Sequence, residues 1–197
     1  VNDWQDIAYF SSPGKFSNYS IMQVEVDSLG NVYVSDTGNS RLQKFNSEGE
    51  LLQVFGGDGE DTWPNVGSGS ADGQFASNYM RFVVDYSNNV YVLDDGNERI
   101  QKFNSSGNFL SKWGSTGHLN GQLSDSRQIA VDKNNNIYVY GYAQDSAFRR
   151  IQKFSSNGAY IATFGTTGPT EEQLPYYYGE SPNNQNMAID DNGNVYV

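Results

Sequence analysis

The sequence predicts an all-β protein of the β-propeller type, built of four-stranded antiparallel blades. One phrase recurs along the 197 residues, and each copy holds short apolar or aromatic runs separated by turn-forming residues. Some of these runs do not alternate with polar residues, as they would in a sheet with one face in water. Sheets that stack against one another on both faces satisfy these observations together.

The repeated phrase spans residues 31–55 and reads NVYVSDTGNSRLQKFNSEGELLQVF. Further copies span residues 89–113 and 136–164, and a fourth begins at residue 194 with NVYV. The starts of the four copies lie 58, 47 and 58 residues apart, close to the roughly 40 to 50 residues of a four-stranded propeller blade. The period therefore indicates one blade per copy.

Each blade is predicted to be a meander of four short strands, as the first copy illustrates. Its three separators, residues 28–30, 37–40 and 46–49, consist largely of Ser, Gly, Asn and Thr, which accept left-handed backbone or cap a turn with a side-chain oxygen. Four short strands joined by tight turns form an antiparallel sheet. The strands that these separators delimit are residues 21–27, 31–36, 41–45 and 50–55.

The second strand of each blade is apolar on both faces. It reads Val-Tyr-Val at residues 32–34, 90–92 and 195–197, and Ile-Tyr-Val at residues 137–139. A sheet that lies between two like sheets needs apolar residues on both faces. Blades stacked radially around an axis meet that requirement.

Residues 27–49 and 85–107 share a longer pattern, in which Asp and a short turn precede Asn-Val-Tyr-Val. Asp-x-Gly-Asn-x-Arg, then Leu or Ile, then Gln-Lys-Phe and a Gly-bearing turn complete it. At these residues the chain resembles the NHL repeat family of β-propellers, and the resemblance covers nearly the whole chain. The third copy departs from the pattern, since Gly141 replaces the Asp and four extra residues precede Arg150. Its second loop is therefore expected to differ from the others.

The repeats place blades at approximately residues 14–57, 73–114, 121–165 and 173–197, with residues 1–13 as the outer strand of a preceding or closing blade. The last blade contains only its first two strands, and ring propellers usually contain more blades than these. We therefore expect an incomplete portion of a roughly six-bladed ring. A complete four-bladed ring and a ring assembled from several chains are the alternatives.

Charge and composition exclude several classes of function. The net charge of −11 and the pI near 4.3 repel nucleic-acid phosphates, so no nucleic-acid partner is expected, although some proteins similar in fold bind RNA. No run approaches the roughly 18 apolar residues of a membrane span. Cysteine is absent, and the sequons at Asn18 and Asn104 suit an extracellular or cell-surface location.

Two sets of acidic residues are predicted to be structural. An Asp ends each first strand and is expected to accept hydrogen bonds from the amides of the following turn; these residues are Asp27, Asp85, Asp132 and Asp190. Calcium is the alternative ligand, but none of these turns has the length of a known calcium loop, so no cofactor is predicted. Across the second hairpin, Asp36 is expected to pair with Arg41 and Asp94 with Arg99.

The lengths of the loops predict which end of the blades binds a partner. In a four-stranded antiparallel blade, the first and third turns lie at one end, and the second turn and the crossover to the next blade lie at the other. The first and third turns are uniform, whereas the crossovers 55–73 and 113–121 differ in length and residues 141–149 and 175–184 are extended. Variation on one face of a rigid scaffold usually marks the functional face.

The variable segments carry aromatic side chains beside carboxylates. Such groups can stack on sugar rings, contact a protein partner or hold a cation, or the rings can fold back over the channel mouth. The candidate binding residues are Asp58, Glu60, Asp61, Trp63, Tyr142, Phe148, Tyr176, Tyr177 and Tyr178, with Glu171, Glu172 and Glu180 beside them.

The residues favour a non-catalytic interaction scaffold that binds protein or glycan through the variable face. Propellers related to the NHL family include metal-dependent amidating lyases and lactonases, whose ligands are His or carboxylates around the channel. The single histidine, His118, excludes a multi-His zinc site within these residues. A lyase or lactonase-like enzyme with a carboxylate site, and a surface assembly that self-associates through open blade edges, remain the alternatives.

Overall fold

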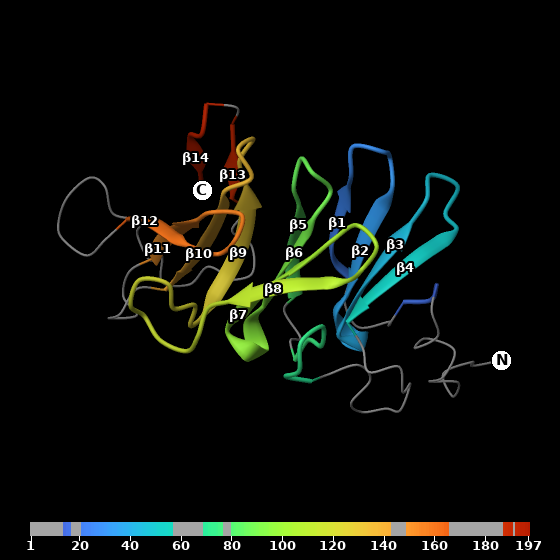
Figure 1. Ribbon diagram of the computed structural model, residues 1–197, viewed down its shortest axis with the longest axis horizontal. Coiled ribbons are helices and arrows are strands. Elements are labelled where there is room, and N and C mark those ends of the chain that lie inside the picture. The colour runs from blue at the N-terminus through green and yellow to red at the C-terminus, as the bar shows by residue number, and fades with distance from the viewer. Residues whose placement is uncertain are drawn as a thin grey trace, which may run out of the picture.

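The computed structural model describes residues 14–16, 21–56, 69–76, 80–142, 149–165, 187–190 and 192–197. The strands form three four-stranded sheets and one two-stranded hairpin, and each four-stranded sheet is a meander in chain order. All the pairings are antiparallel, and the sheets lie side by side like the blades of a fan (Figure 1). The predicted all-β propeller fold is therefore confirmed.

The bounds of the strands follow the repeat. The first sheet contains β1 (Ile21–Val26), β2 (Val32–Asp36), β3 (Arg41–Phe45) and β4 (Leu51–Gly56). The second contains β5 (Met80–Val84), β6 (Val90–Asp94), β7 (Arg99–Phe103) and β8 (Phe109–Trp113). The third contains β9 (Ser126–Val131), β10 (Ile137–Tyr142), β11 (Arg149–Phe154) and β12 (Tyr160–Phe164), and the hairpin contains β13 (Ala188–Ile189) and β14 (Val195–Tyr196).

The first strands of successive sheets are neighbours: β1 contacts β5, β5 contacts β9, and β9 contacts β13. This arrangement makes them the inner strands, and the outer strands β4, β8 and β12 lie farthest from the axis. Figure 1 shows the tight turns of the first sheet at one end of its strands and its second turn at the other. The parity argument thus holds for this sheet.

The Val-Tyr-Val strands are apolar throughout because consecutive side chains enter two different cores. In β6, Val92 packs in the core between the first and second sheets, together with Tyr33 and Phe82. Its neighbour Tyr91 packs in the core between the second and third sheets, with Ile129. A strand points alternate side chains to opposite faces, so burial of both faces removes the apolar–polar alternation.

The repeated Phe that ends each third strand occupies an equivalent buried position in all three sheets. Phe45, Phe103 and Phe154 are 9%, 1% and 1% exposed. Each pairs in register with the first residue of the second strand, and these partners are Val32, Val90 and Ile137. The ring of Phe103 makes edge contacts with the rings of Phe55, Phe75 and Phe109, at centroid distances of 5.8, 5.7 and 6.0 Å.

The second turn of the first two sheets is a short 3-10 helix rather than an open tight turn. These helices are η1 (Thr37–Asn39) and η2 (Asp95–Asn97). Each ends on a residue in the left-handed region, Ser40 at φ 48° and Glu98 at φ 50°. The turn chemistry in the sequence indicated left-handed backbone here but did not distinguish the 3-10 turn.

Replacement of Phe103 by Ala tests how much the core between the first two sheets contributes. Loss of a fully buried Phe is expected to lower the free energy of unfolding by about 3–5 kcal/mol, because the site leaves a cavity. The measurement is urea unfolding followed by circular dichroism. The matched control is Leu110→Ala on β8, where the side chain is 49% exposed and the expected change is about 0.5 kcal/mol or less. Equal losses in the two variants would contradict this assignment of the core.

Candidate functional site

The aspartates that end the first strands are fully engaged by their own turns. Asp27 Oδ1 accepts hydrogen bonds from the amides of Leu29 and Asn31, each at 2.9 Å. Its Oδ2 accepts from Asn31 Nδ2 at 2.8 Å and from the Tyr33 hydroxyl at 3.2 Å. Burial raises the pKa of Asp27, but these bonds and the Lys44 ammonium outweigh burial and hold that pKa below its usual value. The same bonds recur at Asp85, Asp132 and Asp190.

Lysines of the first two sheets connect the tight-turn end of their blade to the next blade. Lys44 lies 3.5 Å from Asp27 Oδ2 and donates a hydrogen bond to the carbonyl of Ser105, in the third turn of the second sheet, at 3.3 Å. Lys102 donates in the same way to the carbonyl of Ser156, in the third sheet, at 3.0 Å. The tight-turn end is thus a repeated network of structural contacts.

At the opposite end, side chains of each blade hold the chain segment that enters that blade. In the first sheet, Arg41 Nε donates to Asp36 Oδ2 at 2.8 Å, and its Nη2 donates to the carbonyl of Lys15 at 3.0 Å. Gln43 Nε2 donates to the same carbonyl at 2.6 Å, and Gln43 Oε1 accepts from the amide of Gly14 at 2.7 Å. We call this arrangement of Arg, Gln and the entering segment the clamp.

The second sheet builds the clamp more extensively. Arg99 Nε donates to Asp94 Oδ2 at 2.9 Å, and the two side chains are 8% and 0% exposed. Gln101 donates to the carbonyl of Gln74 at 2.6 Å and accepts from the amide of Gly73 at 2.8 Å. The Arg99 guanidinium also donates to three carbonyls of the entering segment, those of Ser70, Ala71 and Gln74, at 2.8–2.9 Å.

The third sheet keeps the clamp without its aspartate. Arg150 and Gln152 both donate to the carbonyl of Gln122, at 3.0 and 2.6 Å, and Gln152 accepts from the amide of Gly121. Gly141 pairs with Arg150 in register, where Asp36 pairs with Arg41. A Cβ at Gly141 would meet the Cα of Ser126 at 3.0 Å, so the close approach of β9 explains the glycine.

A repeated triplet in the sequence marks the segments held by the clamp, although the sequence alone did not predict their role. Gly-Lys-Phe, Gly-Gln-Phe and Gly-Gln-Leu occur at residues 14–16, 73–75 and 121–123, each before its blade's first strand. These triplets are the segments that the Arg and Gln side chains hold. The paired residues Asp36 with Arg41 and Asp94 with Arg99 are in place across the hairpin, and the structure adds their role in the clamp.

Of the candidate binding residues, Tyr142 lies in the described part of the chain. It is half-buried at the end of β10, and the guanidinium carbon of Arg149 lies 3.5 Å from its ring centroid. A guanidinium stacked on an aromatic face makes a stable pair, which fixes the two ends of the extended loop. The remaining candidates, Asp58, Glu60, Asp61, Trp63, Phe148, Tyr176, Tyr177 and Tyr178, lie outside the described residues.

A charged cluster spans the second and third blades at the variable end. Arg127, on β9, lies 3.9 Å from Asp95 on η2 and 3.5 Å from Asp125. Burial raises the pKa of Asp95 to about 6, because the attraction of Arg127 does not outweigh burial together with the repulsion of Asp125, Glu98 and Asp94.

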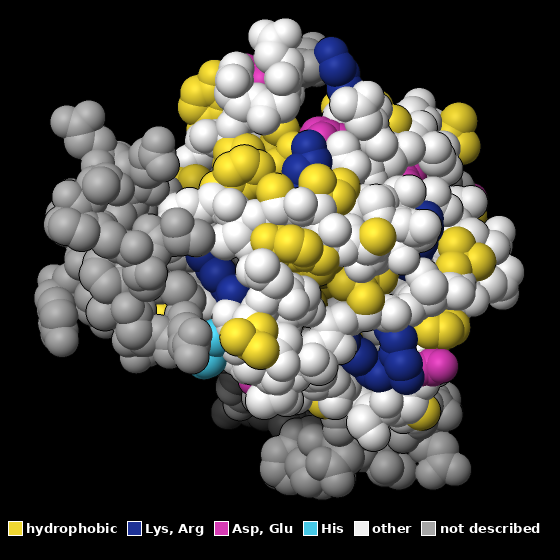
Figure 2. Space-filling view, turned by 60° about the vertical axis from the view of Figure 1, so that its left-hand side comes forward, with side chains coloured by type: hydrophobic (Ala, Val, Ile, Leu, Met, Phe, Trp, Pro, Cys, Tyr) yellow, Lys and Arg dark blue, Asp and Glu magenta, His cyan; other side chains and the backbone are white. Residues whose placement is uncertain are grey.

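The described residues contain no group of three or more His, Asp or Glu side chains placed to hold a metal ion. In the same part of the chain, no helix has the length and apolar character needed to cross a membrane. On the face shown in Figure 2, Lys and Arg side chains form separate spots rather than a continuous basic patch.

Comparison with known proteins identifies the repeat and the fold. Residues 24–45 match the NHL repeat. Protein brain tumor of Drosophila melanogaster is 27% identical over 160 residues, which cover 77% of this chain and 14% of that protein. This chain therefore spans about one seventh of the length of that relative.

Among solved structures, a protein of unknown function from Bacteroides caccae has a TM-score of 0.53 at 15% identity, over 92% of this chain and 53% of that one. Virginiamycin B lyase from Staphylococcus aureus has a TM-score of 0.51 at 12% identity, over 80% of this chain and 46% of that one. At these identities the likeness shows the fold alone. This chain spans about half the length of those structures.

The clamp of the second sheet is expected to be a main source of order at the variable end. Arg99→Met leaves the Asp94 carboxylate buried without its cation and should lower the free energy of unfolding by about 3–5 kcal/mol. Hydrogen exchange of the amides in residues 69–76 should accelerate, because their carbonyls lose the guanidinium. The control is Lys112→Met, whose partner Asp72 and own side chain are 49% and 46% exposed, with an expected loss of about 0–1 kcal/mol.

The raised pKa of Asp95 predicts a pH dependence of stability. An acid with a pKa near 6 in the folded chain and 3.8 in the unfolded chain binds more protons when folded, so the free energy of unfolding falls as pH rises from about 4 to about 6. Asp95→Asn removes this contribution, and the variant should gain stability relative to the parent across that range. Urea unfolding at pH 4.5 and pH 7 measures the gain. Parallel curves for the two proteins would contradict the prediction.

Proposed function

Because the chain is an NHL-repeat β-propeller protein, we propose that it is a non-catalytic interaction scaffold that binds a partner protein through the variable end of its blades. NHL propellers commonly mediate protein interactions. The proposal rests on the structural difference between the two ends of the blades. At one end, the turns form a repeated network of contacts between blades. At the other end, the clamp holds the segments that enter the blades, and these segments differ in length.

At the tight-turn end, the charged side chains of the first blade are already engaged in contacts within the protein. The carboxylate oxygens of Asp27 accept bonds from their own turn, and the Lys44 ammonium is committed to the next blade. At the variable end, Tyr142 and Arg149 form a stacked pair at the root of the extended loop. Aromatic and Arg side chains of this kind are typical anchors of protein interfaces.

The acidic composition and the location of the protein are part of the proposal. A net charge of −11 suits a partner with a basic surface, which the carboxylates would attract over long range. The low number of basic residues and the sequons at Asn18 and Asn104 support an extracellular or cell-surface location. A glycan partner is the competing outcome, because exposed aromatic rings also stack on sugars.

The test screens the purified chain against arrays of extracellular proteins and of glycans, and then compares variants for binding to each hit by biolayer interferometry. Replacement of Trp63, Tyr142 or Tyr177 by Ala should weaken binding of the partner protein by about 2 kcal/mol or more, because aromatic anchors dominate interface energies. Melting temperatures measured in parallel separate lost contacts from lost folding.

Ser28→Ala and Glu48→Ala at the tight-turn end are the matched controls, since both residues are exposed there. They should bind the partner as the parent does. Greater weakening by these controls than by the three aromatic variants would place the interface at the tight-turn end and contradict the proposal. A stoichiometric metal in elemental analysis, together with turnover of a lactone or lyase substrate, would favour the enzyme alternative over the scaffold.

A further inference from the structure

The fold repeats one interface, in which the first strand of a blade packs against the tyrosine of the blade before it. Tyr33 lies in one core with Phe82 and Val84 of β5, and the ring centroids of Tyr33 and Phe82 are 6.4 Å apart. The two later interfaces repeat this contact. Their members are Tyr91 with Ile129 and Val131, and Tyr138 with Met187 and Ile189. The structure thus shows three times what covers such a pair of first-strand residues.

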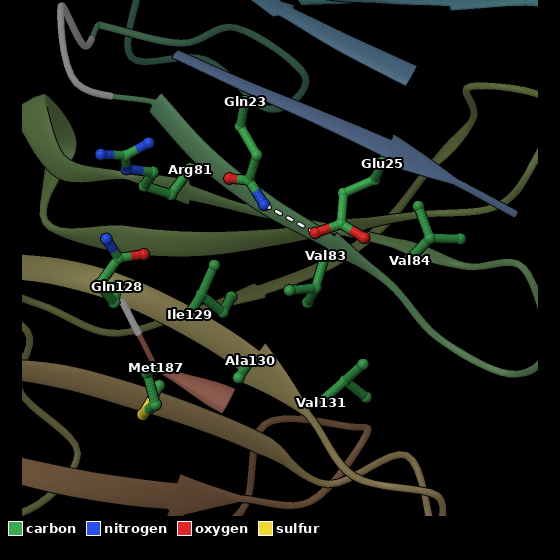
Figure 3. Close-up of a pocket in the computed structure, with 10 residues that line it drawn as sticks. All are labelled: Gln23, Glu25, Arg81, Val83, Val84, Gln128, Ile129, Ala130, Val131 and Met187. Carbon is green, nitrogen blue, oxygen red and sulfur yellow. Dashed lines mark hydrogen bonds between the residues drawn. The ribbon is translucent and has the colours of Figure 1, made fainter. Parts of the chain in front are cut away.

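The first sheet presents the same pair exposed to solvent. Val24 and Val26 stand on β1 where Phe82 and Val84 stand on β5, each paired in register with a Val of the second strand. Val24 is 56% exposed and Val26 is 60% exposed, whereas Phe82 is 0% exposed. Figure 3 shows four counterparts of this pair along the inner wall, and they are Val84, Ile129, Val131 and Met187.

The rest of this face is built as in the other interfaces. The ring centroid of Phe16 lies 5.7 Å from that of Phe45, and Phe75 lies at the same distance from Phe103 in the core between the first two sheets. Val34 and Phe45 are both buried. The exposed pair on β1 is thus the part of this face that a tyrosine meets in the later blades.

The hairpin presents the matching tyrosine, which is also exposed. Tyr196 pairs in register with Ala188, and its hydroxyl donates to Asp190 Oδ2 at 3.1 Å, as the hydroxyl of Tyr138 donates to its own aspartate. Tyr196 is nevertheless 57% exposed, whereas Tyr138 is 2% exposed. Its neighbour Val195 packs against the third sheet, so the alternation of a strand directs Tyr196 to the opposite face. The chain therefore exposes both halves of its repeated interface.

We propose that two copies of this chain associate head to tail, with Tyr196 of one copy packed on Val24 and Val26 of the other. The two faces are the halves of an interface that the fold already builds three times, so their residue types match. Within one copy the two faces do not meet, because the first sheet and the hairpin lie at opposite ends of the stack (Figure 1). The surfaces differ from each other, so the contact is heterologous. It joins sheet faces and is distinct from pairing between open edge strands.

The contact is apolar in a protein of high net charge, and this combination gives it a characteristic salt dependence. The net charge of −11 makes two copies repel each other, whereas Val24, Val26, Ala188 and Tyr196 carry no charge. Added sodium chloride screens the repulsion and leaves the apolar contact in place. Association should therefore tighten as the salt concentration rises.

Analytical ultracentrifugation of the full chain, over a series of protein concentrations at low and at high salt, measures the association. The expected result is a reversible rise in mass from one chain to two or more as the protein concentration increases, at lower concentrations in high salt. A monomer throughout would overturn the second copy as the occupant and would leave the face to a different protein. Association that weakens in high salt would also overturn the proposal, since it indicates a contact between charges.

Two uncharged variants test the two faces separately. Val24→Ser combined with Val26→Ser, and Tyr196→Ser alone, should each weaken self-association about tenfold or more, because apolar area is lost from the contact. These side chains are exposed in a single copy, so circular dichroism spectra and melting temperatures of dilute samples should change little. Tyr142→Ala at the variable end and Glu48→Gln at the tight-turn end are the controls, and both should associate as the parent does. Unchanged association in either face variant would overturn the contact.

A mixture of the two variants distinguishes the head-to-tail contact from a symmetric one. Copies with the β1 pair replaced keep an intact hairpin, and copies with Tyr196 replaced keep an intact first sheet. An equimolar mixture can therefore form one complete contact, which neither variant can form alone, and it should associate more tightly than either variant by itself. The gain also shows that both variants are folded. A mixture that associates no more tightly than its components would overturn the head-to-tail arrangement.

Discussion

Each blade depends on the burial of both of its faces. A single meander such as the second sheet would expose Val92 on one face and Tyr91 on the other, and contact with the first and third sheets covers them. The stability of a blade is therefore the stability of its interfaces, as in other repeat proteins. The uniform apolar strands, the buried Phe at each third strand and the regular turns all serve that requirement.

Polar side chains complete the stacking where apolar burial ends. Near the tight turns, Lys44 and Lys102 join successive blades by donating to a carbonyl of the next third turn. At the other end, the Arg and Gln of the clamp satisfy carbonyls of a segment that lies outside any sheet. Because buried backbone groups need partners, the clamp lets crossovers of different length end at the same fixed point. Changes in loop length at this end then have little effect on the stability of the blades.

The parts of the fold that follow from local pattern were predictable. Turn residues and apolar runs predicted the strands, and turn chemistry predicted the bonds from backbone amides to Asp27, but not those from the side chains of Asn31 and Tyr33. The clamp was not predictable in this way, since Gln43 and Gln74 are ordinary polar residues in sequence and their role depends on contacts between segments about 30 residues apart. Gly141 showed the same limit, because the reason for its missing side chain lies on β9. Of the binding residues proposed from sequence, the described residues include only Tyr142.

In a repeat protein, each residue can be compared with the residues at the equivalent positions of the other repeats. Where four blades agree, as at Asp27 and its counterparts, the shared contacts show that architecture explains the residue. Where one blade departs, architecture alone gives no reason for the change, and the departure has to be explained by local geometry or by a ligand. Gly141 has a local reason in the approach of β9, and Asp95 occupies the position of Thr37 beside the cationic Arg127 of the next blade.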